Sequence, residues 1–139
     1  ENAQAIAKTM NAAGFDVVPV EMDLSSRASI QNIIAEAQKY GDITMLVNAA
    51  GVSPSQAPIE AILKVDLYGT AVLLEEVGKV IAPGGVGVTI SSQSGHRMKQ
   101  LTPEEDELHA HRGTSELASA SAGKYPGYAA RLPAGQAVQ

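Results

Sequence analysis

The chain has 139 residues and a formal net charge of −5, with 15 acidic and 10 basic side chains. This acidic balance and an aromatic content of 4% exclude a basic, base-stacking surface for nucleic acid. The sequence contains no cysteine, which excludes a disulfide framework and a thiolate zinc site. It has no apolar run of about 18 residues and no signal-peptide pattern, so we expect a soluble, cytoplasmic domain without a membrane partner.

The first predicted element is a helix that is already under way where the sequence begins. "ENAQAIAKTMNAAG" opens at Glu1 without a methionine, places Ile6 and Met10 four positions apart, and reaches a helix-stopping glycine at Gly14. We therefore expect the chain to be a fragment of a longer protein. The valine-rich "FDVVPVEMDLS" that follows predicts a strand over residues 16–22, despite its proline.

A second helix and a second strand come next. "SSRASIQNIIAEAQKYG" predicts a helix with its N-cap at Ser25 or Ser26 and its stop at Gly41. The apolar face of this helix consists of Ile30, Ile33, Ile34 and Ala37. "DITMLVNAAG" is an apolar run that ends in small residues, which predicts a buried parallel strand.

The third helix and strand complete the pattern. Pro58 begins the helical stretch "PIEAILKVDLYGTAVLLEEVGKVIAPGG", and "VGVTISS" follows it as a strand. The order α-β-α-β-α-β with apolar strands predicts an α/β fold, in which a parallel sheet of three strands carries helices on both faces.

The C-terminal part of the sequence changes character. Thr102 and Glu105 form a capping box around Pro103, which predicts a helix start. Residues 109–139 are rich in Ala, Ser and Gly and follow no sustained period, so they predict an irregular or disordered tail after a domain at 1–108. His109 and His111 have no evident third ligand, and we expect no metal site.

Polar or small residues stand at the end of each predicted strand, where parallel sheets bind ligands. These are Asp23, the turn from Asn48 to Gly51, and the pair Ser91–Ser92. Each has an ordinary explanation: Asp23 can start a loop or assist a helix cap, Gly51 can supply a positive φ in a tight turn, and a serine pair is common in turns.

Taken together, these stretches resemble the short-chain dehydrogenase/reductase family, single-domain type. The resemblance rests on "VEMDL", "LVNAAG", "VDLYGT" and "VTISSQSG", which occur in the family's order and spacing across residues 1 to about 100. "LVNAAG" departs from the family's NNAG because Ala49 replaces an asparagine. The resemblance implies a partial Rossmann-like, doubly wound sheet and an oxidoreductase that uses NAD or NADP, with the preference open.

The resemblance also implies roles for individual residues. Asp23, with Leu24 beside it, would accept a hydrogen bond from the adenine amino group. The turn of Asn48, Ala49, Ala50 and Gly51 would line the adenosine half of the cofactor. Ser92 would hold the oxygen of an alcohol or ketone substrate, while a tyrosine with a lysine four positions later would act as acid and base.

Several family features differ or are missing. Asp66 stands where the family usually has an asparagine, whose backbone carbonyl is thought to hold a water molecule of a proton relay. The glycine-rich turn that seats the pyrophosphate would lie before Glu1. No tyrosine in the chain has a lysine four positions later. The chain alone is therefore expected to be inactive.

The C-terminal tail suggests an explanation for the missing tyrosine–lysine pair. Residues 124–139, back-translated with permitted codons and read one base later, can give "NIQDTLHAYQLAKR", which contains Tyr-x-x-x-Lys. We therefore hypothesise that the sequence after about residue 108 is a shifted reading frame, which the nucleotide sequence of the gene would decide.

The family resemblance also bears on stability and assembly. By resemblance the sheet order is 3-2-1-4-5-6-7, and the three predicted strands correspond to the third, fourth and fifth. The 16–22 strand would then lack its neighbours, which predicts a marginal or aggregation-prone chain. The intact relative is expected to pair subunits through the helix at 58–82.

Two other functions remain open. One is a non-catalytic nucleotide-binding or interaction module that has lost its chemistry. The other is an unrelated flavodoxin-like regulatory domain, which would carry a phosphoacceptor aspartate at the end of its first strand.

Overall fold

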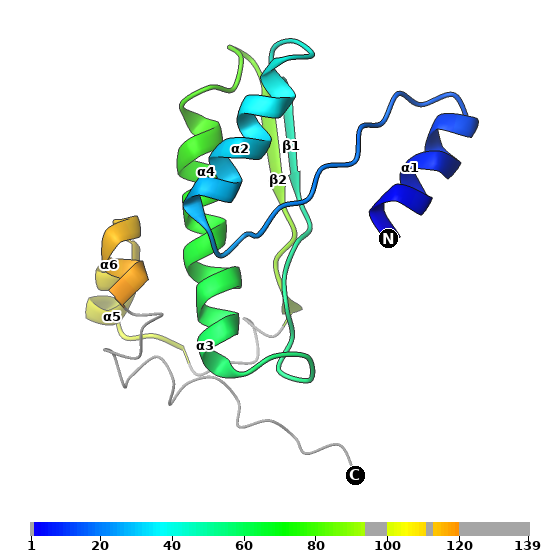
Figure 1. Cartoon of the computed structure of the whole chain (residues 1–139). Helices are drawn as coiled ribbons and strands as arrows, with labels where there is room; N and C mark the ends of the chain where they lie inside the picture. Colours follow the sequence, from blue (N-terminus) through cyan, green and yellow to red (C-terminus); the bar gives the residue numbers. More distant parts are fainter. Residues whose placement is uncertain (1, 94–99, 111–112, 120–139) are drawn as a thin grey trace.

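The computed structural model describes residues 2–93, 100–110 and 113–119. Within them lie two short strands and a series of helices (Figure 1). In chain order the elements are α1 (Asn2–Ala12), α2 (Arg27–Gln38), β1 (Met45–Asn48), α3 (Ile59–Ile62), η1 (Leu63–Gly69), α4 (Thr70–Gly78), β2 (Val86–Thr89), α5 (Pro103–Ala110) and α6 (Thr114–Ser119).

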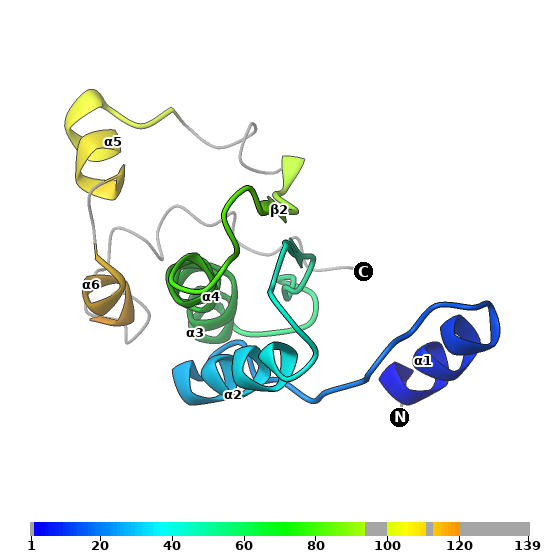
Figure 2. The same cartoon turned by 90° about the horizontal axis from the view of Figure 1, so that it is seen from above.

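The two strands form a parallel pair, with Met45 opposite Val86 and Asn48 opposite Thr89. A parallel pair needs a long crossover connection, and α3, η1 and α4 supply it as one helical column. Figure 2 shows α2 and α4 side by side on one side of the strands and α1 on the other side. The predicted α/β architecture with parallel strands is confirmed.

The core lies between α2 and α4. Ile30 and Ile34, four positions apart on α2, are buried as their spacing predicts. They join a cluster that consists of Leu24, Ile30, Ile34, Val72, Leu73 and Val77. Ser26 is the N-cap of α2, since its side chain accepts a hydrogen bond from the Ser29 N–H. The prediction of this helix is confirmed, with Ser26 as the cap.

The helical column from α3 to α4 begins after Pro58, as predicted, and contains a π-helical segment at its centre. In η1 each backbone hydrogen bond spans five residues, where an α-helix spans four. This π-helical geometry is rare in proteins as a whole, and where it occurs it is often at a functional site. The sequence pattern did not predict η1.

The predicted strand over residues 16–22 is wrong. These residues are extended but have no strand partner within the described residues. The Asn11 side chain holds the segment to α1 instead: its Oδ1 accepts from Val17 N at 2.7 Å and its Nδ2 donates to Val17 O at 3.1 Å. A β-strand exists only when a neighbour satisfies its backbone groups, and in the described part of the chain no strand pairs with this segment.

The prediction that the strand at β1 is buried is also wrong for one face of the sheet. Five apolar side chains on that face are between 52% and 64% exposed: Met45, Val47, Val86, Val88 and Ile90. We call them the bare face. Although α1 lies on that side of the strands (Figure 2), it leaves them uncovered. The opposite face packs on the core through Leu46.

The C-terminal region is more regular than the sequence predicted. The helix α5 begins at Pro103, as the capping pattern predicts. Beyond His109, however, Thr114–Ser119 forms α6, and Leu117 on this helix is buried. Packing against the helical column therefore orders residues that carry no clear periodic signal. The remainder of the predicted irregular tail, with Tyr125 and Tyr128, lies outside the described residues.

Candidate functional site

Two of the three predicted strand ends, those after β1 and β2, meet at the carboxyl edge of the sheet, at the lower end of the strands in Figure 1. β1 ends at Asn48 and β2 ends opposite it at Thr89. The next residue, Ile90, donates its N–H to the Asn48 carbonyl at 2.9 Å. The turn after β1 and the pair Ser91–Ser92 after β2 therefore begin side by side.

The side chain of Asn48 shapes the turn that follows it. Asn48 is 4% exposed, its Oδ1 accepts from Ala50 N at 3.3 Å, and its Nδ2 donates to Thr70 Oγ1 at 3.5 Å. An asparagine that bonds to the backbone two residues later imposes a turn. Ala49, Ala50 and Gly51 are exposed along this turn. The turn thus presents backbone and small side chains to solvent.

Asp66 in η1 is bound to the same turn. Its Oδ1 accepts a hydrogen bond from Val52 N at 2.9 Å. A Cβ on Gly51 would lie 3.2 Å from the same oxygen, tighter than an ordinary contact. Gly51 does not have a positive φ, so the explanation of this glycine as a left-handed turn residue is wrong. Its small size matters here because it allows Asp66 to approach.

Asp23 forms a second polar turn, at the start of α2. Its Oδ1 accepts from the Ser25 hydroxyl at 2.7 Å and from Ser25 N at 2.9 Å. These two bonds favour the carboxylate and lower the pKa of Asp23. Asp23 N donates to Ser29 Oγ at 2.9 Å. The turn therefore presents an exposed, ionised carboxylate above a buried Leu24.

The structure brings most of the predicted site residues to one edge. Asn48–Gly51 and Asp66 are joined directly through Val52, and Leu24 contacts η1 at Gly69. Ser92 is exposed and follows two residues after Ile90, which is bonded to Asn48. Gly95 of the "VTISSQSG" pattern lies outside the described residues.

Sequence reasoning missed three contributors to the site, namely Val52, Gly69 and Thr70. Gly69 and Thr70 stand in the "VDLYGT" stretch, but their roles depend on contacts with Leu24 and Asn48 that the local sequence does not show.

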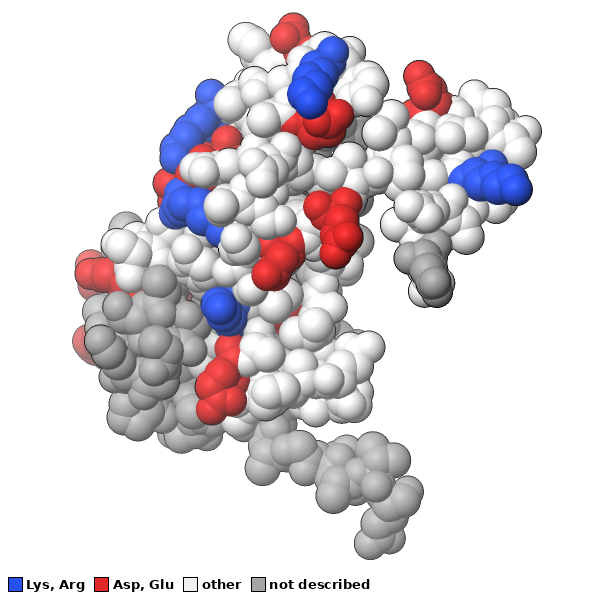
Figure 3. All heavy atoms as spheres, viewed as in Figure 1, with Lys and Arg blue, Asp and Glu red and all other residues white. Residues whose placement is uncertain are grey.

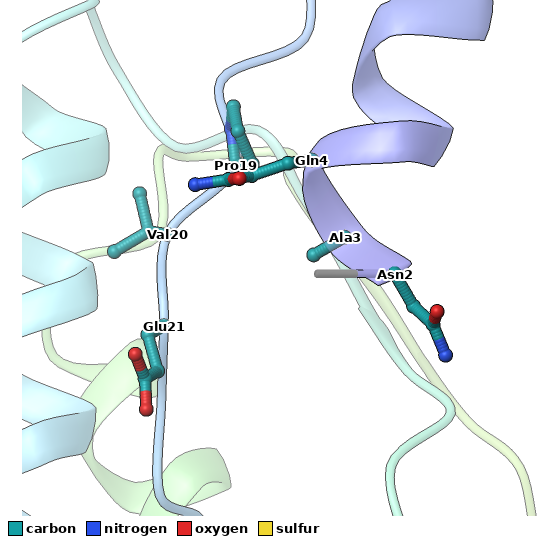
Figure 4. Close-up of a pocket in the computed structure, with 6 residues that line it drawn as sticks. All are labelled: Asn2, Ala3, Gln4, Pro19, Val20 and Glu21. Carbon is teal, nitrogen blue, oxygen red and sulfur yellow. The ribbon is translucent and has the colours of Figure 1, made fainter.

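Other places in the described part of the chain offer weaker sites. An open hollow between α1 and the extended segment is lined by Asn2, Ala3, Gln4, Pro19, Val20 and Glu21 (Figure 4). None of them belongs to the predicted site. No group of three or more His, Cys, Asp or Glu side chains in the described ranges could hold a metal ion. Among the described helices, none is long and apolar enough to cross a membrane.

The comparison with protein families identifies the family of the chain. The family model described as short chain dehydrogenase matches residues 1–103. The chain belongs to the short-chain dehydrogenase family. The prediction of the family from the four sequence motifs is therefore confirmed.

Individual relatives agree. The chain is 36% identical over 100 residues to the short-chain dehydrogenase/reductase bsc3 of Alternaria brassicicola, covering 72% of this chain and 36% of that protein. It superposes with a TM-score of 0.60 on a short-chain dehydrogenase/reductase of Serratia marcescens, at 23% identity, covering 92% of this chain and 52% of that one.

A short chain dehydrogenase of Burkholderia cenocepacia, solved in complex with NADP, also superposes with a TM-score of 0.60, at 20% identity. It covers 93% of this chain and 54% of that one. The superpositions confirm the Rossmann-like fold class. The chain spans about a third to a half of the length of these relatives.

Proposed function

We propose that this chain forms part of an NAD(P)-dependent oxidoreductase that transfers hydride between a nicotinamide cofactor and a secondary alcohol or ketone. The observation that carries the proposal is the Asp66–Val52 hydrogen bond, which fixes the Asn48–Gly51 turn beside the end of β2. Family membership and the NADP complex of the Burkholderia relative support the choice of cofactor.

The residues present suit the adenosine half of a dinucleotide. Asp23 offers an ionised acceptor, which suits the amino group of adenine. Leu24 supports that turn from below, and the exposed Ala49, Ala50 and Gly51 leave room for a ribose or base to approach the backbone. NAD and NADP both carry this half, so the proposal covers either cofactor.

Ser92 and Asp66 are assigned to the chemical end of the site. The exposed Ser92 hydroxyl would bind the substrate oxygen and orient it. Asp66 would act through its backbone carbonyl, since its carboxylate is engaged with Val52 N and, unlike an amide, has no hydrogen to donate. When bound, the nicotinamide supplies the hydride chemistry, and the protein supplies position and charge.

The 139-residue chain by itself is proposed to be inactive. No tyrosine in its sequence has a lysine four positions later, so the phenol that would serve as acid and base lacks the cation that stabilises its ionised form. This same feature favours a second candidate, a nucleotide-binding module without catalysis. In a protein that also carries the glycine-rich turn and the Tyr-x-x-x-Lys pair, a substrate-dependent change in NAD(P)H absorbance would support the enzyme and exclude the module.

Assembly is proposed on the helical column from α3 to α4. This column would pair subunits in an intact relative, and Leu74, which is 46% exposed, lies on it. The substrate is proposed to be a small alcohol or ketone, with neither nucleic acid nor membrane as a partner.

A titration with ADP-ribose tests the proposed nucleotide site. Replacing Asp23→Asn removes the charged acceptor, and loss of a hydrogen bond to a charged group typically weakens binding by roughly 10- to 100-fold. We expect Asp23→Asn to weaken ADP-ribose binding on that scale, and the matched control Asp42→Asn, an exposed aspartate outside the site, to leave it unchanged. Equal affinity of both variants would contradict the assignment.

A further inference from the structure

Gly69 lies at the closest approach between the helical column and the Asp23–Leu24 turn. A Cβ placed on Gly69 would lie 2.3 Å from the Leu24 carbonyl oxygen, 3.0 Å from its carbonyl carbon and 2.9 Å from its Cγ. Two of these three atoms are backbone, so no side-chain rotation relieves the overlap. Any residue larger than glycine must displace the turn, the helical column or both.

Backbone conformation does not explain this glycine. Gly69 has φ −61° and ψ −43°, which every residue adopts in a helix. Glycine inside a helix is in fact unfavourable relative to alanine. The feature that requires glycine is therefore the contact with Leu24 and not the geometry of η1.

The contact with Gly69 adds to the local hydrogen bonds and the core packing of Leu24 that hold this turn. Leu24 is 5% exposed and belongs to the core, while Asp23 beside it is exposed and bonded to Ser25. How deep Leu24 sits against Gly69 therefore sets where the Asp23 carboxylate stands.

The same helical segment also holds the second turn. Asp66 lies three positions before Gly69 and binds Val52 N, next to the Asn48–Gly51 turn. The segment η1 thus contacts both turns. The Asp66 carboxylate binds the end of one turn, and the absence of a side chain at Gly69 lets the other turn pack closely against the helix. The relative placement of the two turns depends on this segment.

We propose that Gly69 is a positioning residue that sets the depth of the Asp23–Leu24 turn relative to the Asn48–Gly51 turn. Its meaning for ligand binding rests on the proposed function, because both turns are assigned to the adenosine half of the cofactor. Gly69 itself is buried behind the turn and acts through Leu24.

Hydrogen exchange of backbone amides tests the structural part. The variants are Gly69→Ala and the matched control Gly78→Ala, since a Cβ on Gly78 at the end of α4 meets nothing within 4 Å. Gly69→Ala is expected to speed exchange at Ser26 N, which donates to Asp23 O at 3.0 Å, by about tenfold or more relative to the control. Exchange at Ile90 N, bonded to Asn48 O, should be the same in both.

Titration with ADP-ribose tests the functional part. Gly69→Ala should weaken binding by about tenfold, on the scale of a lost hydrogen bond, and Gly78→Ala should not. If Gly69→Ala shows the exchange effect but the unsubstituted chain binds no ADP-ribose, the proposed function fails while the positioning role of Gly69 stands. If the chain binds and Gly69→Ala binds equally well, the inference is overturned.

A folding control keeps the test decisive. If Gly69→Ala loses protection at Ile90 N as well, the variant Leu24→Val is measured in its place. This change loosens the contact between Leu24 and Gly69 from the side of Leu24 without adding atoms. A selective rise in exchange at Ser26 N then supports the inference. Unchanged exchange at Ser26 N, or no protection there in the unsubstituted chain, overturns it.

Discussion

The carboxylate of Asp66 is the side chain on which the geometry of the candidate site depends most. It is half-buried and accepts the Val52 N–H, a backbone donor that is itself half-buried. A buried donor left without its acceptor costs more than the bond contributes, because its lost hydration is not replaced.

Two substitutions at Asp66 should separate the effect of losing the hydrogen-bond acceptor from the effect of losing the negative charge. Asp66→Ala leaves Val52 N without its acceptor and is expected to lower the free energy of unfolding by about 1–3 kcal/mol. Asp66→Asn retains an oxygen that can accept from Val52 N, so its effect should be smaller than that of alanine. Urea denaturation followed by circular dichroism measures both. Equal losses for alanine and asparagine would show that the Val52 bond is not what the side chain contributes.

At the scale of elements, a network of charged side chains joins α2, α4 and α6. Figure 3 shows acidic and basic side chains grouped on the side of the molecule where α2 and α4 lie. Arg27 pairs with Glu75 through two bonds of 3.0 and 3.1 Å and also with Glu76. Lys79 reaches both glutamates at 2.9 and 2.8 Å. Thr114 of α6 donates to Glu75 Oε2 at 2.6 Å and accepts from Arg27 at 3.1 Å. The network therefore links α6 to the core.

The network predicts acid sensitivity. Hydrogen bonds from Arg27, then from Thr114 and Lys79, hold the pKa of Glu75 well below its ordinary value of 4.5. A group whose pKa is lowered by folding contributes stability that is fully present above its unfolded value and is lost as pH falls toward the folded value.

We therefore expect the melting temperature of the chain to fall as pH drops below about 4.5. Glu75→Gln should melt lower at neutral pH and lose less on acidification, because it has no carboxylate to protonate. Glu21→Gln, which lies outside the network, serves as the control. An unaltered pH profile for Glu75→Gln would contradict the assigned role.

The elements differ in how far the sequence could predict them. The helix α2 carries its own signals, a cap at Ser26 and buried isoleucines at positions 30 and 34, so local pattern was sufficient. The segment 16–22 has strand composition, but a strand needs a partner that composition cannot supply. The helix α6 was missed because a tertiary contact at Leu117 stabilises it.

The residues of the candidate site likewise divide into those that the sequence predicted and those that it did not. The strand-end rule located Asn48–Gly51 and Ser92 from order and spacing. Gly69 and Val52 were not predicted, since their roles come from contacts across the fold. Nothing in the local sequence shows that Leu24 packs within a few ångströms of Gly69.

For the whole molecule, the dominant feature is the bare face of Met45, Val47, Val86, Val88 and Ile90. Exposed apolar strands with open edges favour association with another chain. We expect the 139-residue chain to self-associate, and Val47→Thr with Val88→Thr to reduce that association. Tyr40→Ser, a change at a 68% exposed side chain outside this face, is the control. Analytical ultracentrifugation measures the outcome, and a monomer at all concentrations would disprove it.

The central claim is that the carboxyl edge of the sheet is a nucleotide-binding site, and mapping by NMR tests it most directly. Titration of the chain with NADPH is expected to shift the amide signals of Ser25, Ala50 and Val52, which mark the two turns. Shifts confined to the hollow of Figure 4, at Ala3, Val20 and Glu21, or no shifts at millimolar ligand, would contradict it.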